Sequence, residues 1–174
     1  MGGQLNTQQS VFREKLIEHL FIGELLKYSW LQHGATLEIS YPSIDRTGHD
    51  VVLEANGVTR HIQLKTSSIN STTATQNVHV GLQKKPSGCV IWVRFNPNTL
   101  ALGPFHFFGG LPGKPMQPIE NFAVAKHTKA NAVGIKLDRP NLRILQKAKF
   151  KTVLTIEALY ASLFIDSISL PKSI

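Results

Sequence analysis

Residues 50–65 read DVVLEANGVTRHIQLK, and this stretch sets the expected fold. Two runs with strand character, 50–54 and 59–65, lie on either side of the dipeptide Asn56-Gly57. Asn-Gly between two strands with alternating hydrophobic residues is the strongest short signal for a hairpin with a two-residue type I′ loop. The sequence therefore predicts an antiparallel hairpin that turns at this dipeptide.

The predicted loop also fixes the register of the two strands. With Asn56 and Gly57 in the loop, Asp50 lies opposite Gln63. Directly opposed residues share a sheet face with Cβ atoms about 5 Å apart. Lys65 is two residues beyond Gln63 and points to the same face. Asp50, Gln63 and Lys65 should therefore converge at the open end of the hairpin.

A carboxylate, an amide oxygen and an ammonium group at one place suit a site for a hard cation. Magnesium takes oxygen ligands and usually binds one or two carboxylates together with substrate phosphate. Asp50 would supply charge, and the Gln63 side chain and the Leu64 backbone carbonyl would supply neutral ligands. Lys65 would position or deprotonate an attacking water, or stabilise charge that develops on phosphorus. An ordinary polar cross-strand cluster is the structural alternative.

A long helix is expected from about Thr7 to His33, where Gly34 ends it. Glu24 falls on a stripe of apolar residues at helical spacing. The stripe consists of Ile17, Leu20, Tyr28 and Leu31. An acid on an apolar helix face is costly unless it is paired or binds a cation, so Glu24 is expected as a second metal ligand. A solvent-facing groove is the alternative, and Glu14 and Glu18 are expected in solvent.

The whole chain, residues 1–174, is expected to form one globular domain with a basic C-terminal part from about residue 124. Its 174 residues are 42% hydrophobic, which excludes a disordered chain. The expected elements are strands at 35–40, 78–82 and 89–95, a polar loop at 66–73, an irregular segment at 103–118, a segment at 124–145 that fits helix or strand, and a helix at 153–164.

The charge balance points to a polyanionic partner. The chain carries a net charge of +8, and residues 126–151 hold eight basic side chains against the single acid Asp138. Such a segment suits nucleic acid, although a solvated basic face would look the same. No stretch has the roughly 20 apolar residues of a membrane span, and no signal peptide is evident. The single cysteine, Cys89, excludes an internal disulfide or a cysteine zinc site and is expected to be buried.

Three motifs together resemble the PD-(D/E)xK nuclease superfamily, in the branch of Holliday-junction resolvases and Mrr-like restriction enzymes. They are Glu24 with Gly34 ten residues later, Gly48-His49-Asp50, and Gln63-Leu64-Lys65. The resemblance covers residues 11–95. It implies an α/β fold with a restriction-endonuclease-like core, a mixed sheet of about four or more strands flanked by helices in the order αβββαβ. It also implies a cytoplasmic, prokaryotic enzyme that hydrolyses DNA phosphodiester bonds with Mg²⁺, for which Mn²⁺ may substitute.

The resemblance assigns a role to each motif residue. Glu24, Asp50 and Gln63 would be catalytic metal ligands together with the Leu64 carbonyl, and Lys65 would be the catalytic lysine. Gln63 is neutral where the family usually has an acid, which removes a negative charge from the ion site. A catalytically inactive DNA-binding or scaffolding subunit of the same fold, or a basic RNA-binding protein, are the alternatives.

Further residues are expected to contact DNA phosphates. Hydroxyl groups and lysines make such contacts without reading bases. The candidates are Thr66, Ser67, Ser68, Lys84, Lys85, Lys147, Lys149 and Lys151. Solvated charge is the alternative for each lysine. A homodimer would supply two sites for the two strands of DNA. Asp45 would be an additional ligand or, more simply, part of a turn.

Overall fold

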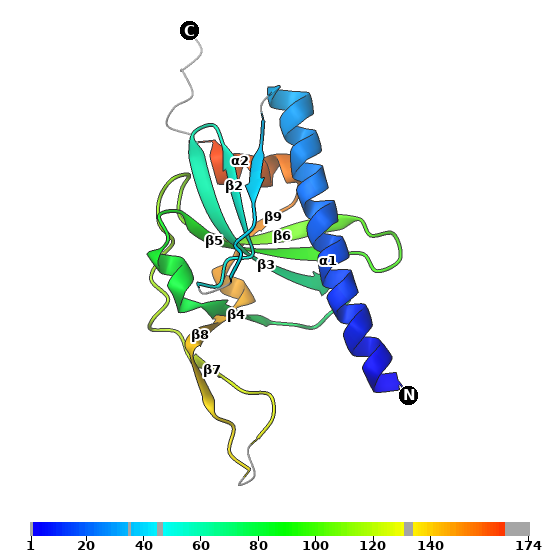
Figure 1. The fold of residues 1–174 in the computed structure, drawn as a ribbon, viewed down its shortest axis with the longest axis vertical. Helices are drawn as coiled ribbons and strands as arrows, with labels where there is room; N and C mark the ends of the chain where they lie inside the picture. The colour runs from blue at the N-terminus through cyan, green and yellow to red at the C-terminus, as the bar shows by residue number, and fades with distance from the viewer. Residues whose placement is uncertain (1, 35, 45–46, 131–133, 166–174) are drawn as a thin grey trace.

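The computed structural model describes residues 2–34, 36–44, 47–130 and 134–165, with side chains from residue 9 onward. It is a mixed α/β structure with two helices, a six-stranded sheet and a three-stranded sheet (Figure 1). The helices are α1 (Gly2–Tyr28), which continues as a π-helical turn (Ser29–His33), and α2 (Ile156–Phe164). Among the described residues no helix is long and apolar enough to cross a membrane.

The six-stranded sheet has the order β1-β2-β3-β5-β6-β9. Its strands are β1 (Glu38–Ser40), β2 (Val51–Ala55), β3 (Val58–Ser68), β5 (Gly88–Phe95), β6 (Leu102–Gly109) and β9 (Lys151–Val153). Only β3 and β5 are parallel, and all other neighbours run antiparallel. The connection between β3 and β5 holds β4 (Thr75–His79) and a 3₁₀ helix (Val80–Lys84) instead of the α-helix that the resemblance implies.

The three-stranded sheet has the order β4-β8-β7, with β7 (Val124–Lys126) and β8 (Asp138–Gln146). The segment 124–145, which the sequence left open between helix and strand, is therefore a β-ribbon. Two separate hydrophobic cores lie on the two faces of β5, one under the helices and one under the three-stranded sheet. Ile91 and Val93 pack with α1 and α2, whereas Val90 and Trp92 pack with Val78 of β4.

Several predicted boundaries are wrong for physical reasons. The strand expected at 78–82 lies at 75–79, and β3 continues to Ser68 through the expected loop. Of the segment 103–118, expected to be irregular, residues 110–118 are irregular, whereas 103–109 belong to β6, which pairs with β5 and β9. Gly103 and Pro104 lie where the ladder shifts register between Val93 and Phe95, so the missing amide of Pro104 interrupts no regular pairing. The last helix begins at Ile156, after β9.

Candidate functional site

The β2–β3 hairpin has the predicted register. Ala55 pairs with Val58, and Val51 pairs with Ile62. Asn56 and Gly57 both have positive φ, 52° and 73°, as a type I′ loop requires. The Asp50 amide also donates to the Ile62 carbonyl at 2.8 Å, one residue out of this register, so the regular pairing ends at Val51–Ile62 and the expected pair Asp50–Gln63 is not part of it. The local prediction from Asn-Gly is confirmed.

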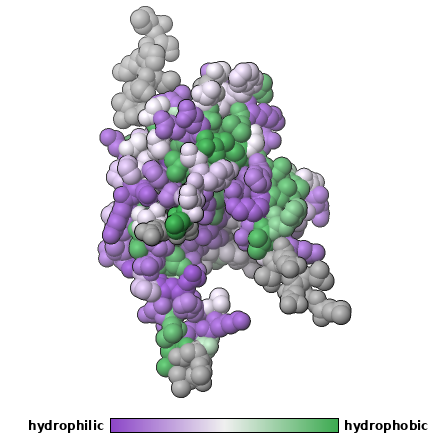
Figure 2. Space-filling view, in the orientation of Figure 1, coloured by the Kyte–Doolittle hydropathy of each residue, from purple (hydrophilic) through white to green (hydrophobic). Residues whose placement is uncertain are grey.

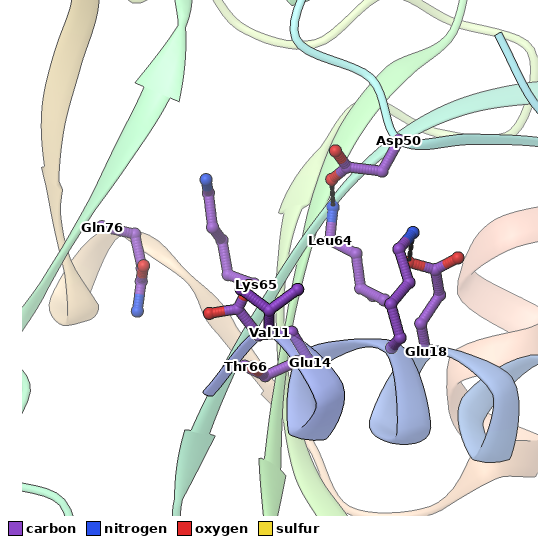
Figure 3. Close-up of a pocket in the computed structure, with 9 residues that line it drawn as sticks. Val11, Glu14, Glu18, Asp50, Leu64, Lys65, Thr66 and Gln76 are labelled. Carbon is purple, nitrogen blue, oxygen red and sulfur yellow. Dashed lines mark hydrogen bonds and ion pairs between the residues drawn. The ribbon is translucent and has the colours of Figure 1, made fainter. Parts of the chain in front are cut away.

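A cleft of about 400 Å³ lies between α1 and β3, close to the start of β2 (Figure 3). The residues that line it come from three elements, α1, β3 and β4, and from Asp50 just before β2. They are Val11, Glu14, Lys15 and Glu18 of α1, Asp50, Leu64, Lys65 and Thr66 of the hairpin, and Gln76 of β4. Asp50 and Lys65 therefore line one cleft together with acids from α1, whereas Gln63, the third residue expected to converge with them, does not line it.

The cleft exists because β3 is longer than β2. β2 begins at Val51, so the part of β3 beyond Gln63 has no neighbouring strand on that side. The Leu64 amide donates instead to Oδ2 of Asp50 at 2.6 Å, which takes the place of a ladder bond. Because backbone groups alternate along a strand, the Leu64 carbonyl faces the same open edge. An acceptor carbonyl and a carboxylate are thus adjacent at the cleft.

Glu18 is the acid of α1 that the fold buries beside this edge. Its side chain is buried, and Oε2 lies 2.9 Å from Nζ of Lys15. The hydrogen bond to Glu18 is the main cause that raises the pKa of Lys15, and the negative charges of Glu18 and Asp50 add to it. Burial and the charge of Glu18 also raise the pKa of Tyr41. Lys15 is therefore a cation held near two carboxylates.

Glu24 lies elsewhere. Its side chain is 48% exposed, pairs with Lys27 at 3.4 Å and lines other cavities, one of them beside Leu100 and Leu102. The expectation that Glu24 shares a buried face is wrong, because the buried face of α1 is centred near Leu25 and not on the predicted stripe. One residue along a helix is a rotation of about 100°, which moves Glu24 to the edge of that face. The expectation of a solvated Glu18 is wrong for the same reason.

Gln63 is on the predicted sheet face but binds the backbone of β4. It is buried, and its Oε1 accepts a hydrogen bond from the His79 amide at 3.2 Å. It is not among the residues that line the cleft. Gly48 also lies against His79, since a Cβ built on Gly48 would be 2.1 Å from Cβ of His79. Gln63 thus fixes β4 against β3 beside the cleft.

Of the three hydroxyl residues after Lys65, only Thr66 lines the cleft. The Ser67 hydroxyl accepts hydrogen bonds from Trp92 Nε1 and Arg94 Nη1, each at 2.7 Å. Ser68 Oγ accepts from the Asn70 amide at 3.2 Å and closes the turn after β3. The structure therefore gives Ser67 and Ser68 roles in holding β3 and its turn.

The predicted phosphate-binding lysines lie outside the cleft. Lys84 is exposed at the end of the 3₁₀ helix, and Lys85 follows it. Burial, His49 and the charge of Lys85 lower the pKa of His61. The other three follow β8: Lys147 is exposed, and Lys149 and Lys151 line a second cavity of about 620 Å³ beside α2. Asp45 lies outside the described residues.

The residues that the sequence reasoning missed are Glu14, Lys15 and Glu18. Their signal was present, because Glu18 precedes Phe21, Ile22 and Leu25 by three, four and seven residues, the spacing of one helix face. Among the described residues no group of three or more His, Cys, Asp or Glu side chains is placed to hold a metal ion. The oxygen donors at the cleft include three carboxylates, of Glu14, Glu18 and Asp50, and the Leu64 carbonyl, which are ligands that magnesium accepts when water and phosphate complete its shell.

Comparison with models of known families, with curated proteins and with solved structures finds no significant match to this chain.

Proposed function

We propose that this chain is a metal-dependent endonuclease that hydrolyses DNA phosphodiester bonds in the cleft between α1 and β3. The observation that carries the proposal is that Asp50, Glu18 and Lys65 line one cleft beside the open edge of β3. Carboxylates and an amine at one cleft are the groups that metal-assisted phosphodiester hydrolysis uses. The basic net charge of +8 supports a polyanionic substrate.

The proposal includes a restriction-endonuclease-like core. Its support is the chain order: a long helix, three antiparallel strands β1-β2-β3, then β5 parallel to β3. The absence of an α-helix between Ser68 and Gly88 is a departure from the pattern that the resemblance implies. In this chain β4 and its sheet cover the face of β5 where such a helix would lie.

Magnesium, or manganese in its place, would be held by Asp50, Glu18 and the Leu64 carbonyl, and when bound would stabilise negative charge on the phosphate. In this proposal Glu18 takes the role that the resemblance assigns to Glu24. Asp50 is oriented for this task because its Oδ2 accepts the Leu64 amide, which fixes the plane of the carboxylate. Lys65 lines the same cleft and would contact the scissile phosphate or orient the attacking water.

A second candidate is a catalytically inactive DNA-binding subunit of the same fold. The observation that favours it is the position of Gln63, whose amide oxygen binds β4 and whose neutrality leaves the site with fewer acids than the family pattern. A homodimer with two clefts fits either candidate, since two strands of DNA require two sites or two binding events.

Cleavage of supercoiled plasmid and of branched DNA, with Mg²⁺ or Mn²⁺ and with chelator, tests the proposal. Wild-type protein should cut only with metal. Asp50→Ala and Lys65→Ala should lose about 100-fold or more of the rate, the usual cost of a group in the reaction. Binding of a fluorescent duplex by each protein shows whether a loss of cutting is a loss of chemistry alone.

Glu18→Gln and Glu24→Gln form a matched pair, because both residues lie on α1 and both pair with a lysine three residues away. Only Glu18→Gln should reduce cutting. Equal activity of both variants would remove Glu18 from the site. Binding by all proteins with cleavage by none would establish the DNA-binding subunit instead.

A further inference from the structure

A two-stranded ribbon leaves the body of the protein, and we call it the arm: residues 124–130 and 134–141. β7 pairs only with β8, and β8 pairs with β4 only from Leu142 onward. The His127 amide donates to the Leu137 carbonyl at 2.9 Å, which continues the ladder outward. Because β8 carries extra residues between Arg139 and Arg143, opposite Ala125 and Val124, the reach of the arm is set by its shorter chain: at about 3.3 Å per residue, Val124 to Ala130 spans at most about 20 Å. Figure 1 shows the ribbon extending away from the rest of the molecule.

The arm is strongly basic and exposed. Its basic side chains are Lys126, Lys129, Lys136 and Arg139, and its acid is Asp138, so the described part carries four positive charges and one negative charge. All five side chains are exposed. Both ion pairs found among the described residues lie on α1, at residues 15–18 and 24–27, so neither neutralises the arm.

The arm carries cations on both of its sides and aliphatic side chains on one of them. Arg139 opposes Ala125 and Leu137 lies beside His127, whereas the pair Lys126–Asp138 between them points to the other side of the ribbon. Leu137 is 56% exposed and Ile135 is 59% exposed. Figure 2 shows hydrophilic surface along the arm with a small hydrophobic area near its end. The end of the arm therefore presents aliphatic surface beside its basic side chains.

We infer that the arm is a second nucleic-acid contact that lies in a groove of duplex DNA outside the cleft. The major groove, about 12 Å wide, admits a two-stranded ribbon, and its walls are phosphates that lysine and arginine neutralise. Exposed aliphatic side chains can contact thymine methyl groups there. The choice of DNA over another polyanion rests on the proposed function.

The arm is joined to the candidate site through β4. Leu142, where the arm begins, pairs with His79, and the His79 amide binds Gln63 beside the cleft. A reach of about 20 Å from this point stays within one helical turn of DNA, about 34 Å. A duplex in the cleft would therefore present a groove to the arm on the same length of DNA.

The test compares Lys129→Gln/Lys136→Gln in the arm with Lys27→Gln/Lys114→Gln, which removes two exposed charges from other surfaces. Binding to a fluorescent duplex of about 30 bp is measured by anisotropy between about 50 and 200 mM salt. The arm variant should reduce the slope of log K against log salt by about two, since each phosphate contact contributes about 0.9. The control variant should keep the wild-type slope.

Other outcomes distinguish a failure of the arm inference from a failure of the nuclease proposal. If the arm variant binds with the control slope while wild-type protein cuts, the arm inference is wrong and the nuclease proposal stands. If binding depends on the arm but wild-type protein cuts nothing, the arm inference stands and the nuclease proposal fails. Arm-dependent binding to single-stranded RNA or to vesicles of anionic lipid, without binding to the duplex, would overturn the inference.

Discussion

Gly48→Ala should destabilise the protein because the end of β4 packs against the bend that contains this residue. Gly48 has φ of +77°, and an added Cβ would lie 2.1 Å from Cβ and 2.8 Å from Cγ of His79. His79 cannot move away easily, since it pairs with Leu142 and its amide is bound by Gln63. The contact lies two residues before Asp50, so it also positions the candidate site.

The magnitude has two parts that a control can separate. A side chain in the left-handed region costs about 1–2 kcal/mol. Overpacking at a close contact costs about 1–3 kcal/mol more. Gly57→Ala carries only the first cost, because Gly57 has φ of +73° and nothing within 4 Å of its added Cβ. Gly48→Ala should therefore exceed Gly57→Ala by about 1–3 kcal/mol in lost free energy of unfolding.

Urea unfolding followed by tryptophan fluorescence measures this difference, because Trp92 is fully buried in the core that β4 covers. Both variants should keep the wild-type dependence on urea and shift the midpoint downward. Gly48→Ala should shift it further and lower the melting temperature by about 4–20 °C. Equal shifts for the two variants would show that β4 does not approach Gly48 as closely as described, and the reasoning would fail.

Three further predictions concern single side chains. Lys15→Met should tighten Mn²⁺ binding about twofold to fivefold, because it removes a cation that competes with the metal for the carboxylates of the cleft. Lys27→Met is the control, since Lys27 is also 64% exposed and also pairs with a glutamate three residues away. Equal Mn²⁺ affinities of the two variants would contradict a metal site beside Lys15. Arg60→Met should lower the free energy of unfolding by about 2–4 kcal/mol, because the buried guanidinium binds three carbonyls, two of them in the last turn of α2; an unchanged urea midpoint would contradict this. Burial raises the pKa of Cys89 to about 12, so a thiol reagent at pH 8 should modify it only after unfolding, and rapid labelling of the native protein would contradict its burial.

The sequence determined the features that depend on neighbouring residues. The long helix ends at Gly34, as its position predicts. Asn56-Gly57 set the turn and hence the register from Ala55–Val58 outward, because a two-residue loop leaves one way to pair the strands. Asp50 and Lys65 accordingly meet at one cleft.

Tertiary structure decided which of several locally allowed choices is used. Two overlapping apolar stripes run along α1, and only packing against the sheet selects the one that buries Glu18 and exposes Glu24. The amide of Gln63 could face solvent, a cation or a backbone donor, and the arrival of β4 supplies the donor. Side-chain periodicity shows which residues share a face of a helix or strand. The group that each of those side chains contacts depends on segments far apart in the chain. For this reason the hairpin could be predicted from the sequence, whereas the residues that line the cleft could not.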